Sequence, residues 1–136
     1  SIHPEKGVFI LCRTSNESAS DFQNNLNHGE PLFEKVAQWA NGLNDFNNVG
    51  LVVGATAPEE LTRVREISPD LSLLIPGVGA QGGDLEHSVK VGNQSGVGLI
   101  NISRGISFAG DMSEKEIRSS AEKYVSQMRS VMRETE

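Results

Sequence analysis

Short apolar runs recur four times along this 136-residue chain and alternate with stretches of helical periodicity. The runs are Gly7–Cys12, Val49–Gly54, Leu71–Pro76 and Val97–Ile102. The first run is continuous and predicts a strand buried on both faces, as in a parallel sheet, and the other three also predict strands. The order β-α-β-α-β-α-β-α therefore predicts an α/β fold with right-handed crossovers, and the length predicts a single domain over residues 1–136.

Each apolar run is followed by a segment that predicts a helix. The expected helix starts are Pro31, a Thr56–Glu59 capping box, Asp84 as an N-cap and a Ser113–Glu116 capping box. The residues expected to face the core are Phe33, Val36, Ala37, Ala40 and Leu43 in the first helix and Leu61, Val64 and Ile67 in the second. In the third helix they are Leu85 and Val89, and in the fourth Ile117, Ala121, Tyr124, Val125, Met128 and Met132. Gly92 is expected to stop the third helix. Residues 17–30 have no period and predict a long loop, either a lid or an ordered excursion.

Charge and composition exclude several classes of function. The net charge is −6, with acidic and basic residues interspersed, and aromatic residues are few, which argues against binding nucleic acid. Cys12 is the only cysteine, so we expect no internal disulfide and a cytoplasmic protein. No run is long enough to cross a membrane, and no signal peptide is recognisable. Because the sequence begins Ser1-Ile2 without a methionine, we expect a processed terminus or a piece of a longer chain.

A glycine-rich stretch, residues 73–84, is the strongest candidate for a binding site. An apolar run ends at Pro76, four glycines and Gln81 follow, and Asp84 opens a helix. Glycines let the backbone approach a ligand, and free N–H groups at a helix start attract anions. The spacing of Gly77, Gly79 and Gly82 matches a dinucleotide fingerprint, but that fingerprint expects an acidic residue about twenty positions later. Arg104 and its polar neighbours stand there instead, so we predict a phosphate site.

All four predicted strands end in small or polar residues, and parallel strands bring those ends to one edge of the sheet. The ends are Thr14–Asn16, Gly54–Thr56, Gly77–Gly79 and Ser103–Gly105. The guanidinium of Arg104 matches phosphate geometry, the amide of Gln81 both donates and accepts, and Ser15 could bond the edge of a base. The alternatives are a surface ion pair, a solvated loop side chain and an ordinary turn residue, respectively. The histidines His3, His28 and His87 lack the spacing of metal ligands, so no metal is expected.

Four segments together resemble the orotidine 5′-phosphate decarboxylase family, in particular its longer, type 2 subfamily. They are Leu11–Asn16, Gly50–Leu61, Leu74–Asp84 and Leu99–Ile106, and the similarity runs over about residues 6–130. The segment Pro76–Asp84 is the most specific of them. The resemblance implies a (β/α)8 TIM barrel, of which this chain would be the C-terminal half, (βα)5–8.

The resemblance also implies an activity and a set of binding residues. The family converts orotidine 5′-phosphate to UMP and CO2 in pyrimidine biosynthesis without a cofactor, as a cytoplasmic homodimer. By resemblance, Ser15 would contact the pyrimidine, Pro76, Gly77 and Gly79 would line the ring and phosphate, Gln81 would bridge the two, and Arg104 would bind phosphate beside the backbone of Ser103 or Gly105.

The catalytic Asp/Lys network of the family has no counterpart in this sequence. The lysines are Lys6, Lys35, Lys90, Lys115 and Lys123, none of them at a predicted strand end. We therefore expect no catalytic residue in this chain. We also expect a bare inner face and open sheet edges, which need a partner: a separate N-terminal half-barrel or a second copy of this chain. The alternatives are a half-barrel that binds nucleotide or sugar phosphates without turnover, a doubly wound interaction domain, and another phosphosugar barrel decarboxylase.

Overall fold

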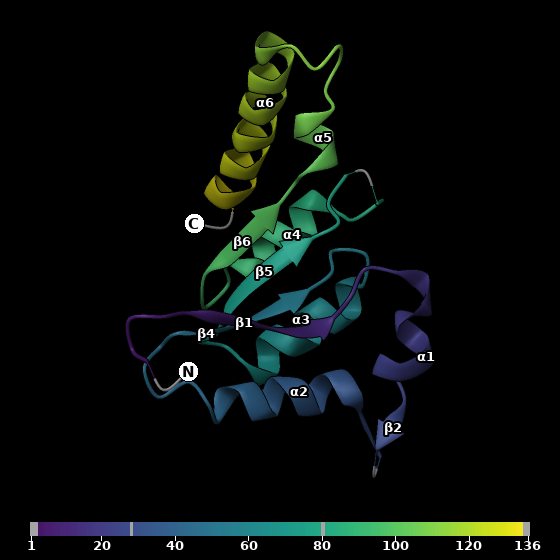
Figure 1. The fold of residues 1–136 in the computed structure, drawn as a ribbon, viewed down its shortest axis with the longest axis vertical. Helices are drawn as coiled ribbons and strands as arrows, with labels where there is room; N and C mark the ends of the chain where they lie inside the picture. Colours follow the sequence, from purple (N-terminus) through teal and green to yellow (C-terminus); the bar gives the residue numbers. More distant parts are fainter. Residues whose placement is uncertain (1–2, 28, 80, 135–136) are drawn as a thin grey trace.

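The computed structural model describes residues 3–27, 29–79 and 81–134 (Figure 1); His28, named above among the histidines, lies outside them. The elements are β1 (Val8–Arg13), a 3-10 turn (Glu17–Ala19), α1 (Ser20–Gln23), β2 (Leu26–Asn27), β3 (Glu30–Pro31), α2 (Leu32–Asn41), β4 (Val49–Val53), α3 (Pro58–Ile67), β5 (Ser72–Pro76), α4 (Leu85–Gly92), β6 (Gly98–Asn101), α5 (Arg104–Ser107) and α6 (Glu114–Arg133). No helix in these ranges is both long and apolar enough to span a membrane.

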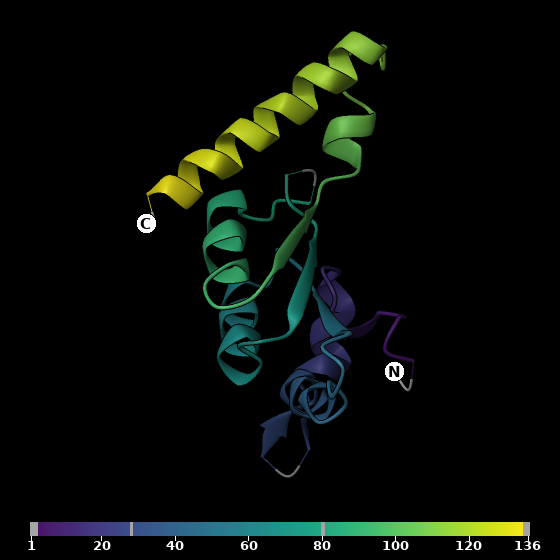
Figure 2. The same cartoon turned by 90° about the vertical axis from the view of Figure 1, so that its left-hand side faces the viewer.

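The four long strands form one parallel sheet in the order β1-β4-β5-β6, which is their order along the chain. A doubly wound sheet reverses its strand order at a switch point, whereas a barrel adds each strand beside the last. Right-handed crossovers then place every connecting helix on one face. α2 packs on β1 and β4, and α4 on β5 and β6 (Figure 2). The fold is therefore a parallel α/β sheet wound in one direction, as in a partial barrel.

The core lies between this sheet and its helices. Leu51, Leu73 and Ile75 point from the strands into it and are fully buried, and the predicted inward residues Leu61 and Val64 of α3 meet them. Asp84 caps α4 as expected, because its Oδ1 accepts a hydrogen bond from the backbone N–H of His87 at 3.1 Å.

The thiol of Cys12 also belongs to the core rather than to a reactive site. It is 3% exposed and donates to the carbonyl of Phe33 at 3.2 Å. Burial raises the pKa of Cys12 to about 12, so the thiol stays protonated at neutral pH. Cys12 therefore contributes packing, as a buried cysteine commonly does.

The other face of the sheet has no layer over it among the described residues. A register row of Leu11, Val52, Leu74 and Leu99 crosses this face from one edge to the other. Leu11 is 59% exposed and Leu99 44% exposed. The prediction that the first strand is buried on both faces was wrong, since only its helix-facing side is covered. In a closed barrel such a row fills the interior.

The connection from β1 to α2 is more ordered than a loop. It contains the 3-10 turn, α1 and the hairpin of β2 and β3, so the ordered excursion was the better of the two predictions. Gln23 fixes it to the sheet, because its Oε1 accepts from the backbone N–H of Thr14 at 2.9 Å. Pro31 is the N-cap of α2 rather than its first residue, and Leu43 lies beyond the helix, 38% exposed.

The predicted capping box at Thr56 is wrong. The N-cap of α3 is Ala57, and the hydroxyl of Thr56 instead donates to the carbonyl of Ser15 at 3.0 Å. Pro58 at the first helical position has no N–H to be capped, which removes one reason for a cap. The hydroxyl of Thr56 therefore joins two strand ends rather than stabilising a helix end.

The C-terminal part contains one element that was not expected, the short helix α5. Helix α6 is capped by Ser113 as predicted, and it packs mainly on α4 and α5 (Figure 1). Because it rests on helices, none of its apolar residues is fully buried, and Met132 is 49% exposed. Helix α4, the third of the predicted helices, includes Gly92, which was expected to stop it, and has Asn93 as its C-cap.

Candidate functional site

The predicted strand ends lie together because hydrogen bonds between neighbouring strands continue past the sheet. The backbone N–H of Gly54 donates to the carbonyl of Arg13 at 2.7 Å, and that of Ala55 donates to the carbonyl of Pro76 at 2.8 Å. A Cβ on Gly54 would lie 2.8 Å from the Cα of Ser15, so only glycine allows this approach. The ends of β1, β4 and β5 therefore form one rim.

Arg13 holds the end of β1 in place, a role that the sequence analysis did not assign. It is 8% exposed, its Nη2 lies 3.1 Å from Oε1 of Glu60 on α3, and its Nη1 donates to the carbonyl of Thr14 at 2.7 Å. Because Thr14 directly precedes Ser15, these bonds restrict where the Ser15 side chain can point. The sequence contains a signal for this pair, since a charged residue ends an apolar run, and the helix after the next strand has two glutamates in its first turn.

Ser15 and Gln81, 66 positions apart in the sequence, are in direct contact. The hydroxyl of Ser15 donates to Oε1 of Gln81 at 3.0 Å. This bond uses the acceptor of the Gln81 amide, and the amide nitrogen Nε2 has no partner among the residues described. The side chain therefore presents a donor to whatever occupies the rim.

The glycine loop closes on itself through its backbone. Gly82 donates to the carbonyl of Gly79 at 2.8 Å, and Gly83 donates to that of Gly77 at 3.2 Å. Gly77 has φ +98° and Gly79 has φ +74°, conformations that favour glycine. A Cβ on Gly77 would also lie 2.7 Å from Oε1 of Gln81. Ala80, in the same loop, lies outside the described residues.

A hollow of about 170 Å³ opens between the glycine loop and the end of β6. It is lined by Pro76, Gly77, Val78, Gln81, Asn101, Ser103 and Arg104. Arg104 is the first residue of α5, and its guanidinium makes no hydrogen bond or ion pair with any residue that the structure describes. The hollow thus combines a fixed positive charge, an amide donor and a glycine backbone that a ligand can approach closely, and this combination suits a phosphate group.

The structure brings most of the predicted site residues together. Five of them line the hollow: Pro76, Gly77, Gln81, Ser103 and Arg104. Ser15 reaches it through its bond to Gln81, whereas Gly79 and Gly105 lie against Tyr124 of α6. Asn101 was not predicted as a lining residue. It pairs with Pro76 in the ladder, and its Oδ1 accepts from the hydroxyl of Ser103 at 3.1 Å.

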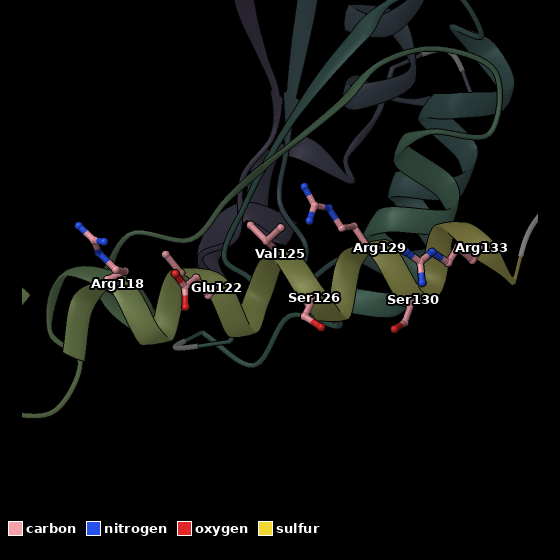
Figure 3. A pocket seen from close by; sticks show the side chains of 8 residues that line it. Arg118, Glu122, Val125, Ser126, Arg129, Ser130 and Arg133 are labelled. Carbon is pink, nitrogen blue, oxygen red and sulfur yellow. The ribbon is translucent and has the colours of Figure 1, made fainter. Parts of the chain in front are cut away.

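A second, wider hollow of about 430 Å³ lies along α6 (Figure 3). Its lining residues all come from that helix and include Val125 and three arginines, Arg118, Arg129 and Arg133. Arg118 donates to Glu114 at 3.0 Å. Because none of the strand ends contributes to it, this hollow is separate from the rim. Within the described ranges, no three His, Cys, Asp or Glu residues are grouped closely enough to hold a metal ion.

Comparison with known proteins places this geometry in a family. The sequence profile of the orotidine 5′-phosphate decarboxylase / HUMPS family matches residues 2–118. The orotidine 5′-phosphate decarboxylase of Halorubrum lacusprofundi is 58% identical over 118 residues, which are 82% of this chain and 43% of that protein. The chain thus spans less than half the length of the curated relatives it matches.

Solved structures agree with the sequence match. The structure of Leishmania donovani UMP synthase has a TM-score of 0.85 and 42% identity, over 96% of this chain and 29% of that one. The structure of Leishmania donovani OMP decarboxylase has a TM-score of 0.82 and 37% identity, over 96% of this chain and 49% of that one. The parallel sheet and its helices therefore correspond to part of those folds.

Proposed function

Because this chain belongs to the orotidine 5′-phosphate decarboxylase / HUMPS family, we propose that it supplies the pyrimidine- and phosphate-binding half of an enzyme that converts orotidine 5′-phosphate to UMP and CO2. The observation that supports this most strongly is the hollow in which Gln81 and Arg104 meet the glycine loop. Such barrels commonly hold phosphate at the loops after their last two strands, with a short extra helix beside them. In this proposal, β5 and β6 correspond to those last two strands, and α5 to the short helix.

Each lining group has a distinct role in the proposed complex. The guanidinium of Arg104 binds phosphate oxygens, with the backbone of Ser103 or Gly105 beside it. Gln81 donates from Nε2 between the phosphate and the ring, while Ser15 holds its Oε1 and faces the pyrimidine. Binding energy from a phosphate group remote from the reacting carbon can be directed to the transition state.

The bond-breaking groups come, in this proposal, from a separate N-terminal half of the barrel. Loss of CO2 leaves an electron pair on ring carbon six, which a lysine must protonate, and an acidic group opposes the departing carboxylate. None of the lysines of this chain lines the hollow at the rim. This chain alone therefore binds and orients but has no catalytic residue, and it should not turn over substrate.

The same partner would cover the surfaces that this chain leaves bare. β1 and β6 are the two edges of the sheet, and each has a neighbour on one side only. A half-barrel of four further strands would pair with both edges and cover the register row that contains Leu11 and Leu99. The completed enzyme is proposed to be cytoplasmic and to form a homodimer, as the family resemblance implies.

Restoring activity by joining halves tests this function. The N-terminal portion of the Halorubrum lacusprofundi enzyme, up to the segment that this chain matches, is fused to residues 1–136. We expect the fusion to release UMP from orotidine 5′-phosphate, and each half alone to release none. The matched control is the same fusion with the lysine of the Asp/Lys network, which the family resemblance implies for the N-terminal half, changed to Ala. A folded fusion that binds UMP without turnover would instead support a non-catalytic binding half-barrel.

A further inference from the structure

Tyr124 of α6 reaches the two segments that form the phosphate hollow. A Cβ on Gly79 would lie 3.0 Å from the hydroxyl oxygen of Tyr124, and a Cβ on Gly105 would lie 2.7 Å from the same atom. Gly79 belongs to the glycine loop after β5, and Gly105 to the first turn of α5. The hydroxyl therefore lies between two segments that are 26 positions apart in the sequence.

A second residue of α6 fixes the same turn. The hydroxyl of Ser120 donates to the carbonyl of Gly105 at 2.8 Å. Ser120 and Tyr124 are four positions apart, so they lie on one face of the helix. Tyr124 also packs against the apolar core together with Ile106 of α5. The position of α5 is thus set from α6, because α5 is only one turn long and has no buried residue of its own.

The Tyr124 hydroxyl fills the space that a side chain would need at either glycine, but Tyr124 does not line the hollow itself. It is not among the residues that line the hollow, and its hydroxyl donates to no atom in the described part of the chain. Its contact with the two glycines is therefore steric. Arg104 directly precedes Gly105, and Gln81 follows Gly79 by two positions, so a shift of either glycine changes the separation between the guanidinium and the amide.

We propose that Tyr124 is a positioning residue, whose hydroxyl sets the spacing between the glycine loop and the Arg104 turn for the phosphate group. This inference rests on the proposed function and deepens it. Gly105 is required because a side chain there would collide with the Tyr124 hydroxyl. Gly79 is required for its positive φ as well, so a side chain there is strained whatever stands opposite.

The first experiment measures kcat and KM of the active fusion with Tyr124→Phe, using both orotidine 5′-phosphate and orotidine, which lacks the phosphate. We expect kcat/KM to fall by about tenfold for the phosphorylated substrate, because a misplacement of about 1 Å can cost about a hundredfold and the loss of one oxygen atom should shift the binding groups by less. The value for orotidine should not change. The matched control is Ser119→Ala, an exposed position on the same helix. Equal losses with both substrates, or no loss with either, would overturn the proposal.

The second experiment tests the steric contact directly. Gly105→Ala should lower kcat/KM for orotidine 5′-phosphate, and Tyr124→Phe added to it should restore part of the loss, because removing the oxygen makes room for the new methyl group. Gly79→Ala should not be rescued by Tyr124→Phe. Additive losses in the Gly105→Ala and Tyr124→Phe double variant would contradict a spacing role and indicate a direct substrate contact. Failure of the proposed function is distinguishable, since the parent fusion would then be inactive with every substrate.

Discussion

Replacing Arg104 with alanine in the active fusion is expected to lower kcat/KM for orotidine 5′-phosphate by about a thousandfold, equivalent to about 4 kcal/mol. The guanidinium is the only cation that lines the hollow as the described residues form it, and its charge has no partner there. Hydrogen bonds between a guanidinium and phosphate are charge-assisted and can be bidentate. Because the phosphate is remote from the reacting carbon, the loss should appear in kcat as well as in KM.

Two controls separate a phosphate role from a general defect. Arg133→Ala removes an exposed arginine of α6 and should leave kcat/KM unchanged. With orotidine as substrate, Arg104→Ala and the parent fusion should react at the same rate, because neither can use a phosphate contact. A loss that is as large for orotidine as for the phosphorylated substrate would show that Arg104 supports the structure instead.

Arg65→Met is expected to have the largest effect on stability, lowering the free energy of unfolding by about 3–5 kcal/mol. Arg65 is 2% exposed, and its guanidinium donates to five backbone carbonyls: those of Val91 at 3.3 Å, Ser68 at 3.2 Å, Pro69 at 2.9 Å, Leu71 at 2.8 Å and Gly92 at 2.6 Å. Burial lowers the pKa of this guanidinium, and the charge of Asp70 offsets part of that shift. Methionine keeps the apolar stem of the side chain but leaves these carbonyls without a donor.

The matched control for this variant is Arg63→Met on the same helix. The Arg63 side chain is 50% exposed, and its ion pairs with Glu34 and Glu66 lie at the surface. Even with its bidentate bonds to Glu34, an ion pair of a half-exposed arginine contributes little, so the urea midpoint of the fusion should fall much less than with Arg65→Met. Equal midpoints for Arg65→Met and Arg63→Met would show that the buried hydrogen bonds do not stabilise the fold.

Much of the fold follows from the sequence because its signals are local. Apolar runs mark all four strands, and Asp84 and Ser113 mark helix starts through hydrogen bonds to residues three positions away. The sequential strand order is not encoded in any such pattern. It came from the family resemblance, and it decides between a partial barrel and a doubly wound sheet.

The errors arise where a side chain meets a distant segment. The hydroxyl of Thr56 could cap α3 or bond Ser15, and only the position of the neighbouring strand decides between them. The exposure of Leu11 depends on whether another layer covers its face of the sheet, which the run itself does not show. Helix α5 is a single turn without an apolar stripe, so its sequence has no periodicity that would predict a helix.

The strand ends that form the candidate site could be predicted from the sequence, but the contacts between their side chains could not. Parallel strands bring their ends to one rim, and this placed Gln81 and Arg104 near each other. The bond from Ser15 to Gln81, the lining role of Asn101 and the approach of Tyr124 depend on loop conformations and on how α6 packs. These three features are long-range, and no spacing in the sequence indicates them.

The most direct test of this account is a crystal structure of the active fusion with bound UMP. The phosphate should occupy the hollow between the glycine loop and α5, with its oxygens within hydrogen-bonding distance of the Arg104 guanidinium and of Nε2 of Gln81. A phosphate bound elsewhere, with Arg104 turned to solvent, would contradict the claim that the ends of β5 and β6 form the phosphate site.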